Sequence, residues 1–147
     1  MKQFDDAIAK CVISLLQTCP PEAVSTRKEL LVATRQILYT EFRKGFHPYI
    51  DDLMNERLLL GSGKHSHSML RPLAYQTIAD LVHHVKESLS ATQLSRVISL
   101  FARNMHDSEL STNVQSTSVK LILSLVDKIC TTVKFTYLFF CCRCYYV

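Results

Sequence analysis

The chain has 147 residues, a formal net charge of +4 and 48% hydrophobic residues, enough for one domain with a buried core. Only 3 residues are Gly, which excludes a turn-rich β-sandwich or barrel and a glycine-rich phosphate-binding loop. Charged residues make up 20% of the chain, and with abundant Leu, Ile and Val this excludes an intrinsically disordered protein.

The first residues do not form a signal peptide, because Asp5, Asp6 and Lys10 interrupt any apolar run. The uncharged run at 135–142 is far shorter than the ~20 residues of a membrane-spanning helix. The basic residues are scattered, and we interpret them as solvated helix faces rather than a nucleic-acid patch; they include Arg27, Lys28, Arg35, Arg43, Lys44, Arg57, Lys64 and Arg71. We therefore expect neither a membrane nor a nucleic acid as partner.

Helical periodicity dominates the first half of the chain. An apolar stripe with steps of three and four predicts a first helix that ends at Cys19-Pro20-Pro21; it comprises Phe4, Ala7, Ile8, Cys11, Val12, Leu15 and Leu16. Thr26 and Glu29 have the spacing of a capping box, which predicts the start of a second helix. Its apolar face would run from Leu30 to Phe42, and Gly45 would follow its end.

The second half of the chain continues this pattern. We expect a helix over 48–60 and a polar loop over 61–68, followed by a helix over 70–85 with Pro72 in its first turn. Ser90 and Gln93 form a second capping box before a fifth helix, and a sixth begins near Thr112. No strand pattern precedes residue 131, and the short connections favour antiparallel neighbours.

The apolar faces of the second, fourth and sixth helices recur at a fixed offset. A shift of 44 residues moves Leu31, Thr34, Ile37 and Leu38 onto Tyr75, Ile78, Leu81 and Val82, and a second shift reaches Val119, Ile122, Leu125 and Val126. This period suits HEAT or armadillo units of ~40–47 residues. We therefore predict an all-α fold in which about three antiparallel helical hairpins, over residues 1–130, stack as a HEAT-like section of a longer α-solenoid.

The sequence offers little for catalysis or metal binding. Asp5-Asp6 and Asp51-Asp52 are neighbours on a helix and would diverge, so we interpret them as first-turn charges. His65 and His67, the His83-His84 pair and the tail cysteines (Cys130, Cys141, Cys142 and Cys144) lack the further ligands of a metal site. We predict no catalytic residue, no cofactor site, no metal site and no small-molecule substrate.

Several long segments carry a family resemblance. LRPLAYQTIADLVHHV at 70–85, QLSRVISLFARNMHD at 93–107 and KLILSLVDKI at 120–129 closely resemble the transformation/transcription domain-associated protein family, as do 28–38 and 46–63. The resemblance implies a nuclear, non-catalytic helical-repeat scaffold that binds transcriptional activators and brings histone acetyltransferase complexes, the SAGA type among them, to promoters. It also implies that the family's inactive kinase-like domain, related to the phosphatidylinositol 3-kinase-like kinases, lies outside this chain.

The last residues depart from the rest of the chain. Residues 131–147 are rich in aromatic residues and cysteine, and the resemblance stops where they begin. We interpret this tail as foreign to the repeat, the product of an alternative or mis-annotated transcript.

Three other interpretations remain open at this stage. The first is a generic HEAT-type adaptor in transport or assembly, and the second is a truncated product without function. The third is a small enzyme or metal protein that uses His65, His67 and the tail cysteines; stoichiometric zinc needed for folding would support it.

Overall fold

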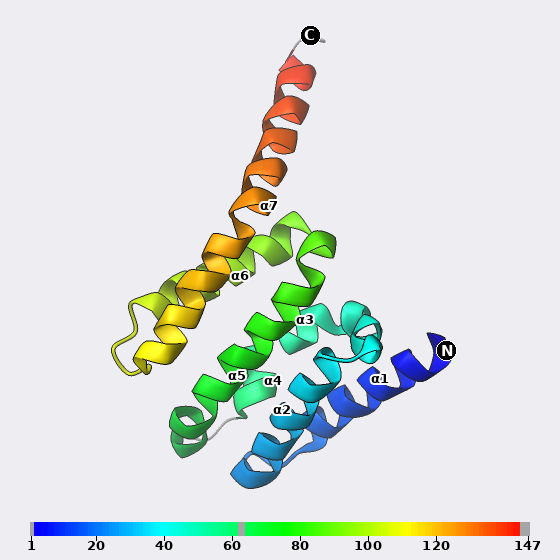
Figure 1. Ribbon diagram of the computed structural model, residues 1–147, viewed down its shortest axis with the longest axis vertical. Helices are drawn as coiled ribbons and strands as arrows, with labels where there is room; N and C mark the ends of the chain where they lie inside the picture. The colour runs from blue at the N-terminus through cyan, green and yellow to red at the C-terminus, as the bar shows by residue number, and fades with distance from the viewer. Residues whose placement is uncertain (1, 62–63, 145–147) are drawn as a thin grey trace.

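A computed structural model describes residues 2–61 and 64–144, with side chains described for 4–61 and 68–132. The elements are α1 (Lys2–Thr18), α2 (Val24–Leu38), the 3-10 segment η1 (Glu41–Tyr49), α3 (Ile50–Leu53), α4 (Glu56–Leu60), α5 (Lys64–Val85), η2 (Lys86–Ser88), α6 (Ala91–Met105) and α7 (Thr112–Cys144). The described residues contain no strand, so the all-α prediction is confirmed. In Figure 1 the helices stack side by side, with α5 between α2 and α7.

Helix α5 forms the centre of the core. Its inward face, Leu70, Ala74, Ile78, Leu81 and Val85, is at most 2% exposed. The helix packs on α2 along one side and on α4 and α7 along others, so one continuous apolar cluster extends from α1 to α7. Burial of these side chains supplies the main stabilisation of the stack.

Polar contacts between neighbouring units join residues about one repeat apart. Arg35 pairs with Asp80, Asp51 with Arg96 and Glu56 with Arg103, at sequence separations of 45, 45 and 47 residues. Lys128 donates to the carbonyl of Glu87, 41 residues earlier. These separations bracket the predicted period of 44 residues, as expected for stacked repeats.

The apolar face that recurs every 44 residues in the sequence is buried in α2 and α5 but only partly in α7. Leu31, Thr34 and Leu38 in α2 and their counterparts in α5 are buried, but Val119 and Val126 in α7 are each 42% exposed. The buried face of α7 is made of Val114, Ser118, Leu121 and Leu125, of which only Leu125 belongs to the predicted set. The prediction for the third copy was therefore wrong for Val119 and Val126, whereas Leu125 is buried and Ile122 packs against the core as predicted. Helix α7 contacts both α5 and α6, so its buried face is rotated from the predicted one.

The start of α2 also differs from the prediction. The amide of Arg27 donates to the carbonyl of Ala23, so the helix begins at Val24 and Thr26 lies within its first turn. The expected capping box at Thr26 is absent from this helix start, whose N-cap has no side-chain hydrogen bond. Helix α2 ends at Leu38, and the hydroxyl of Thr40 accepts from the amide of Phe42, which therefore belongs to η1.

The predicted helix over 48–60 is divided into the end of η1, α3 and α4. The side chain of Asn55 accepts from the amide of Arg57 and starts α4, which ends at Gly61 with a positive φ of 72°. Helix α5 begins at Lys64, so the polar loop is shorter than predicted. Pro72 therefore lies in the helix interior, where it removes one backbone hydrogen bond.

Other helix boundaries are as predicted. The hydroxyl of Ser90 accepts from the amide of Gln93, while the Gln93 side chain accepts from the amide of Ser90, which completes the capping box of α6. Helix α1 ends before Pro20-Pro21, and α7 begins at Thr112. Helix α7 runs on through residue 130 to Cys144, and no helix among the described residues meets the length and hydropathy of a membrane span.

The buried face of α1 is rotated from the predicted stripe. Ala9, Val12, Ile13 and Leu16 are buried, whereas Phe4 and Leu15 are 71% and 48% exposed. The cause is the partner of α1, because this helix packs mainly on η1 rather than on α2. Phe46 of η1 is fully buried there.

Gly45 makes the approach of η1 to α1 possible, rather than ending a helix as predicted. A Cβ at this position would fall well inside the van der Waals radius of the Asp5 carbonyl and would lie 3.2 Å from the amide nitrogen of Asp6. Both obstacles are backbone atoms within a helix, so neither moves as readily as the tip of a flexible side chain.

Gly45→Ala is therefore expected to reduce the free energy of unfolding by about 1–3 kcal/mol, as overpacking does. Urea unfolding followed by circular dichroism measures the loss. The neighbouring exposed Lys44, changed to Ala, is the control and should stay within about 0.5 kcal/mol. An unchanged stability for Gly45→Ala would contradict the close approach.

Candidate interaction surface

The residues considered for catalysis or metal binding do not converge in the described part of the chain. Asp5 lies in the first turn of α1, and Asp51 and Asp52 lie in that of α3, as predicted. The rings of His83 and His84 meet edge to face at 5.3 Å. Among the described residues no group of three His, Cys, Asp or Glu side chains is arranged to hold a metal ion.

The other candidates divide into described and undescribed residues. Cys11, Cys19 and Cys130 are free cysteines, of which Cys19 is buried. The side chains of His65, His67 and the tail cysteines Cys141, Cys142 and Cys144 lie outside the described residues.

A cleft lies between α4, α5 and α6 and is here called the arginine cleft. Its first part has a volume of about 620 Å³ and is lined by residues that include Glu56, Arg57, Arg71, Tyr75, Arg103 and Asp107. Its second part, about 440 Å³, lies between α4 and α6 and shares Glu56, Arg57 and Arg103 with the first, while Arg96 is added. Because the two parts share these residues, they form one continuous polar surface.

Glu56 is the centre of the hydrogen bonds in the cleft. Arg103 donates through Nη2 to both carboxylate oxygens, at 2.8 and 2.7 Å, and the Tyr75 hydroxyl donates to Oε1 at 2.7 Å. The bond to Glu56 raises the pKa of Arg103. Burial and then the same carboxylate raise the pKa of Tyr75. The three side chains are therefore held in one charged arrangement.

Arg71 lines the first part of the cleft. Its guanidinium lies 5.7 Å from the centre of the Tyr75 ring and donates to Asp107. That bond, with a second from the amide of Glu109, lowers the pKa of Asp107. The Asp107 carboxylate stays charged over the physiological pH range, so the first part of the cleft keeps the ion pair between Arg71 and Asp107.

The second part of the cleft, between α4 and α6, carries an excess of positive charge. Its lining contains Arg57, Arg96 and Arg103 against the single carboxylate of Glu56. Arg96 also bonds Asp51 beside the cleft at 2.7 Å, in a pair whose side chains are 50% and 61% exposed. Guanidinium groups form hydrogen bonds and ion pairs with carboxylates, and this is the chemistry that the lining offers.

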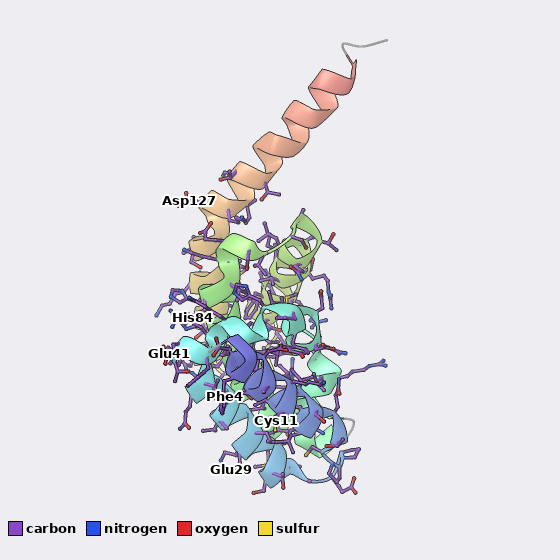
Figure 2. All side chains as sticks on the ribbon, turned by 90° about the vertical axis from the view of Figure 1, so that its right-hand side faces the viewer. Phe4, Cys11, Glu29, Glu41, His84 and Asp127 are labelled. Atoms are coloured by element: carbon purple, nitrogen blue, oxygen red, sulfur yellow. The ribbon has the colours of Figure 1, made fainter. Side chains whose placement is uncertain are left out.

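A second polar contact joins α2 to α5 outside the cleft. Asp80 accepts from Nε of Arg35 at 2.7 Å and from the hydroxyl of Tyr39 at 2.8 Å, and the latter bond raises the pKa of Tyr39. The Tyr39 ring meets His84 at 5.5 Å, and burial together with the charge of His83 lowers the pKa of His84. This contact fixes the spacing of the two helices. Figure 2 shows His84 in the body, away from Asp127 in α7.

The ion pairs of the cleft and of the α2–α5 contact were not predicted, although the sequence contains a signal for three of them. Arg35 and Asp80, Asp51 and Arg96, and Glu56 and Arg103 are opposite charges about one repeat apart. A search for opposite charges at the repeat offset finds them, because stacked repeats place equivalent positions next to one another.

Comparison with known proteins identifies the family. A family model described as the Tra1 HEAT repeat central region matches residues 1–136. The chain belongs to the Tra1 family. It is 46% identical over 125 residues, 85% of the chain, to the transformation/transcription domain-associated protein of Danio rerio. It is 42% identical over 129 residues, 88% of the chain, to the SAGA complex/NuA4 acetyltransferase complex subunit Tra1 of Schizosaccharomyces pombe.

The Tra1-family assignment confirms the resemblance and the helical solenoid inferred from the sequence. The corresponding subunit of Saccharomyces cerevisiae is 41% identical over 129 residues. The chain spans only 3–4% of the length of these Tra1-family relatives.

The interpretation of 131–147 as foreign to the repeat stays a prediction. Sequencing the transcript across codon 130 tests it, and continuous exon sequence would contradict it.

Proposed function

We propose that this chain is a non-catalytic scaffold section of a Tra1-family protein, which acts in the nucleus and binds proteins through the arginine cleft. The observation that carries the proposal is the cleft itself, a concave surface lined by four arginines on a stacked-helix frame. Two relatives that are 41–42% identical to the chain over 129 residues are named as SAGA complex/NuA4 acetyltransferase complex subunits. The partners we propose are subunits of such complexes and the transcriptional activators that recruit them.

The chemistry of the described cleft supports binding rather than reaction. Two of its carboxylates are engaged by arginines, Glu56 by Arg103 and Asp107 by Arg71. A general base needs a proton acceptor that reaches the substrate, and a carboxylate already bonded to a guanidinium is a weak one. No enzymatic step is therefore assigned to this surface.

The experiment is co-purification of the tagged full chain from nuclear extract, with mass spectrometry of the bound proteins. Arg57 is exposed and lines both parts of the cleft, so Arg57→Glu reverses one lining charge without removing any of the four ion pairs described above. We expect recovery of acetyltransferase-complex subunits to fall about tenfold.

Lys10→Glu is the matched control, because Lys10 is an exposed basic residue of α1 outside the cleft lining. It should leave recovery unchanged. Equal recovery for wild type and Arg57→Glu would contradict the cleft as the binding surface. Recovery of transport receptors alone would favour a generic adaptor, and chaperones alone would favour a product without function.

A further inference from the structure

Three arginines from two helices line the second part of the arginine cleft. Arg57 comes from α4 and is exposed, while Arg96 and Arg103 come from α6 and have side chains that are 50% and 59% exposed. Helix α4 also contacts α1 and α5, and α6 also contacts α7, so both walls of this hollow have neighbours on their other sides. The hollow therefore lies between successive units within the stack and not on one of its end faces.

These arginines have hydrogen-bond donors beyond those that hold the internal ion pairs. The bonds from Arg103 to Glu56 leave from Nη2, and the bond from Arg96 to Asp51 leaves from Nη1. Arg57 belongs to none of the four ion pairs that the described residues form. Because a guanidinium has five N–H donors in a planar fork, Arg96 and Arg103 can bind an incoming anion while they keep their own carboxylates.

The spacing of the three guanidinium groups allows them to bind one anion. Arg96 and Arg103 are seven residues apart in α6, which is two turns or about 10 Å along the helix axis. Ser99 lies between them, is exposed and lines the same hollow, so its hydroxyl adds a further donor. Arg57 lines the opposite wall of this hollow, whose volume is about 440 Å³. An anionic group in the hollow would therefore receive hydrogen bonds from both walls.

A phosphate group suits this arrangement better than a carboxylate. Arginines in the lining of the hollow outnumber carboxylates by three to one, although Asp51 beside the hollow reduces the excess charge. An incoming carboxylate would only repeat the contacts that Glu56 and Asp51 already make. A phosphate monoester carries a charge of about −1.5 to −2 and three strong acceptor oxygens, so each of the three arginines can bond a separate oxygen.

The first part of the cleft indicates that a protein segment carries the phosphate. This part has equal numbers of arginine and carboxylate side chains, which are Arg57, Arg71, Arg103, Glu56, Asp107 and Glu109. Leu60, Pro72 and Leu110 also line it, so it suits an uncharged, apolar residue next to the phosphorylated one. A nucleic acid would instead bring a row of phosphates, and those beyond the first would meet the carboxylates of this part.

We propose that the second part of the arginine cleft binds a phosphoserine or phosphothreonine side chain of a partner protein. Arg57, Arg96 and Arg103 bind the phosphate, and an apolar residue of the same segment occupies the first part of the cleft. The inference rests on the proposed function of the cleft and adds the chemistry of the partner. Attachment of the partner to this section of the scaffold then depends on phosphorylation of the partner.

Affinity selection with the purified full chain tests the proposal. The probe is a degenerate peptide library with phosphoserine fixed at its centre, and we expect the retained sequences to be enriched in apolar residues on one side of it. The strongest sequences are then synthesised with phosphoserine, serine or glutamate at the centre and measured by fluorescence anisotropy. The phosphoserine peptide should bind about tenfold more tightly than either of the others, because serine has no charge and glutamate has one oxygen fewer.

Variants of Arg57 test the site without disturbing the fold, because this exposed side chain belongs to none of the ion pairs described above. Arg57→Gln should weaken binding of the phosphoserine peptide about tenfold. Arg57→Lys keeps the charge but loses the planar fork, so it should weaken binding less than Arg57→Gln. Lys10→Gln, outside the cleft lining, is the matched control and should bind like the wild type. Circular dichroism verifies that all variants keep their helices.

Phosphatase treatment of the nuclear extract before co-purification separates this inference from the proposed function. Loss of the bound proteins after treatment would support both. Unchanged recovery from treated extract that is still lost with Arg57→Glu would overturn the phosphate and leave the cleft as the binding surface. Recovery that neither the treatment nor Arg57→Glu reduces would overturn both.

The peptide measurements can also overturn the phosphate site on their own. Equal affinity for the phosphoserine and glutamate peptides would do so, as would selection that retains no sequence from the library. Displacement of the phosphoserine peptide by an equal concentration of single-stranded oligothymidine would indicate a nucleic-acid surface in place of a phosphoprotein site.

Discussion

Arg27→Met is expected to reduce the free energy of unfolding by about 3–5 kcal/mol. Arg27 is a charged residue that is only 3% exposed. Its guanidinium donates through Nη1 to the carbonyls of Leu16 at 3.3 Å and Leu58 at 2.6 Å, and through Nη2 to that of Cys19 at 2.7 Å. One side chain of α2 thus bonds the end of α1 and the middle of α4.

The magnitude follows from what the substitution leaves behind. The last carbonyls of a helix have no partner within it and carry the negative end of its dipole, so a cation there is stabilising. Methionine fills much of the same volume but donates no hydrogen bond. Each orphaned buried carbonyl then costs about 1–3 kcal/mol, partly offset because the guanidinium no longer has to be desolvated.

Urea unfolding of the full chain at fixed protein concentration measures the effect, through the midpoint at unchanged slope. Arg96→Met is the matched control, because Arg96 is half exposed in a surface ion pair and should cost no more than about 1 kcal/mol. Similar losses for the two variants would contradict the role of Arg27.

Leu81→Ala should cost about 2–5 kcal/mol, as truncation of a buried leucine does. Leu81 is fully buried in the C-terminal part of α5, the helix on which α2, α4 and α7 pack. The surrounding helices are fixed by several neighbours each, so the cavity is not expected to collapse. The loss has two parts, the transfer of the removed methyl groups and the unfilled volume that remains.

Thermal and urea unfolding measure this loss as well, and Leu15→Ala provides a control of the same chemistry. Leu15 is 48% exposed on the outer side of α1, so its truncation should cost well under 1 kcal/mol. A small effect at Leu81 together with a large one at Leu15 would mean that the core lies elsewhere.

Local sequence signals were sufficient for the apolar face of α5 and for the start of α6. The stripe of α5 and the capping box of α6 are local features, and the structure keeps both. The predicted apolar face of α1 was wrong because this helix packs on the 3-10 segment η1. The approach of η1 to α1 depends on Gly45 and on the burial of Phe46. A single-helix pattern carries no information on such a partner.

The burial of Arg27 was also not predictable from the local sequence. We interpreted it as part of a solvated face, yet its position is set by α1, α2 and α4 meeting at one point. The ion pairs Arg35–Asp80 and Arg103–Glu56 were predictable in part. The repeat offset relates the two positions of each pair, but only the structure shows that the side chains are in contact. The arginine cleft lies between three helices, so the sequence of a single helix does not predict it.

Contacts one repeat apart join the helices into one stacked body with α5 at its centre. Amide hydrogen exchange of the full chain, measured by mass spectrometry, tests this arrangement. We expect the core amides of α2, α5 and α6 and the N-terminal half of α7 to share the slowest exchange and to lose protection together in denaturant. Loss of protection in α6 and α7 while α2 and α5 stay protected would contradict it.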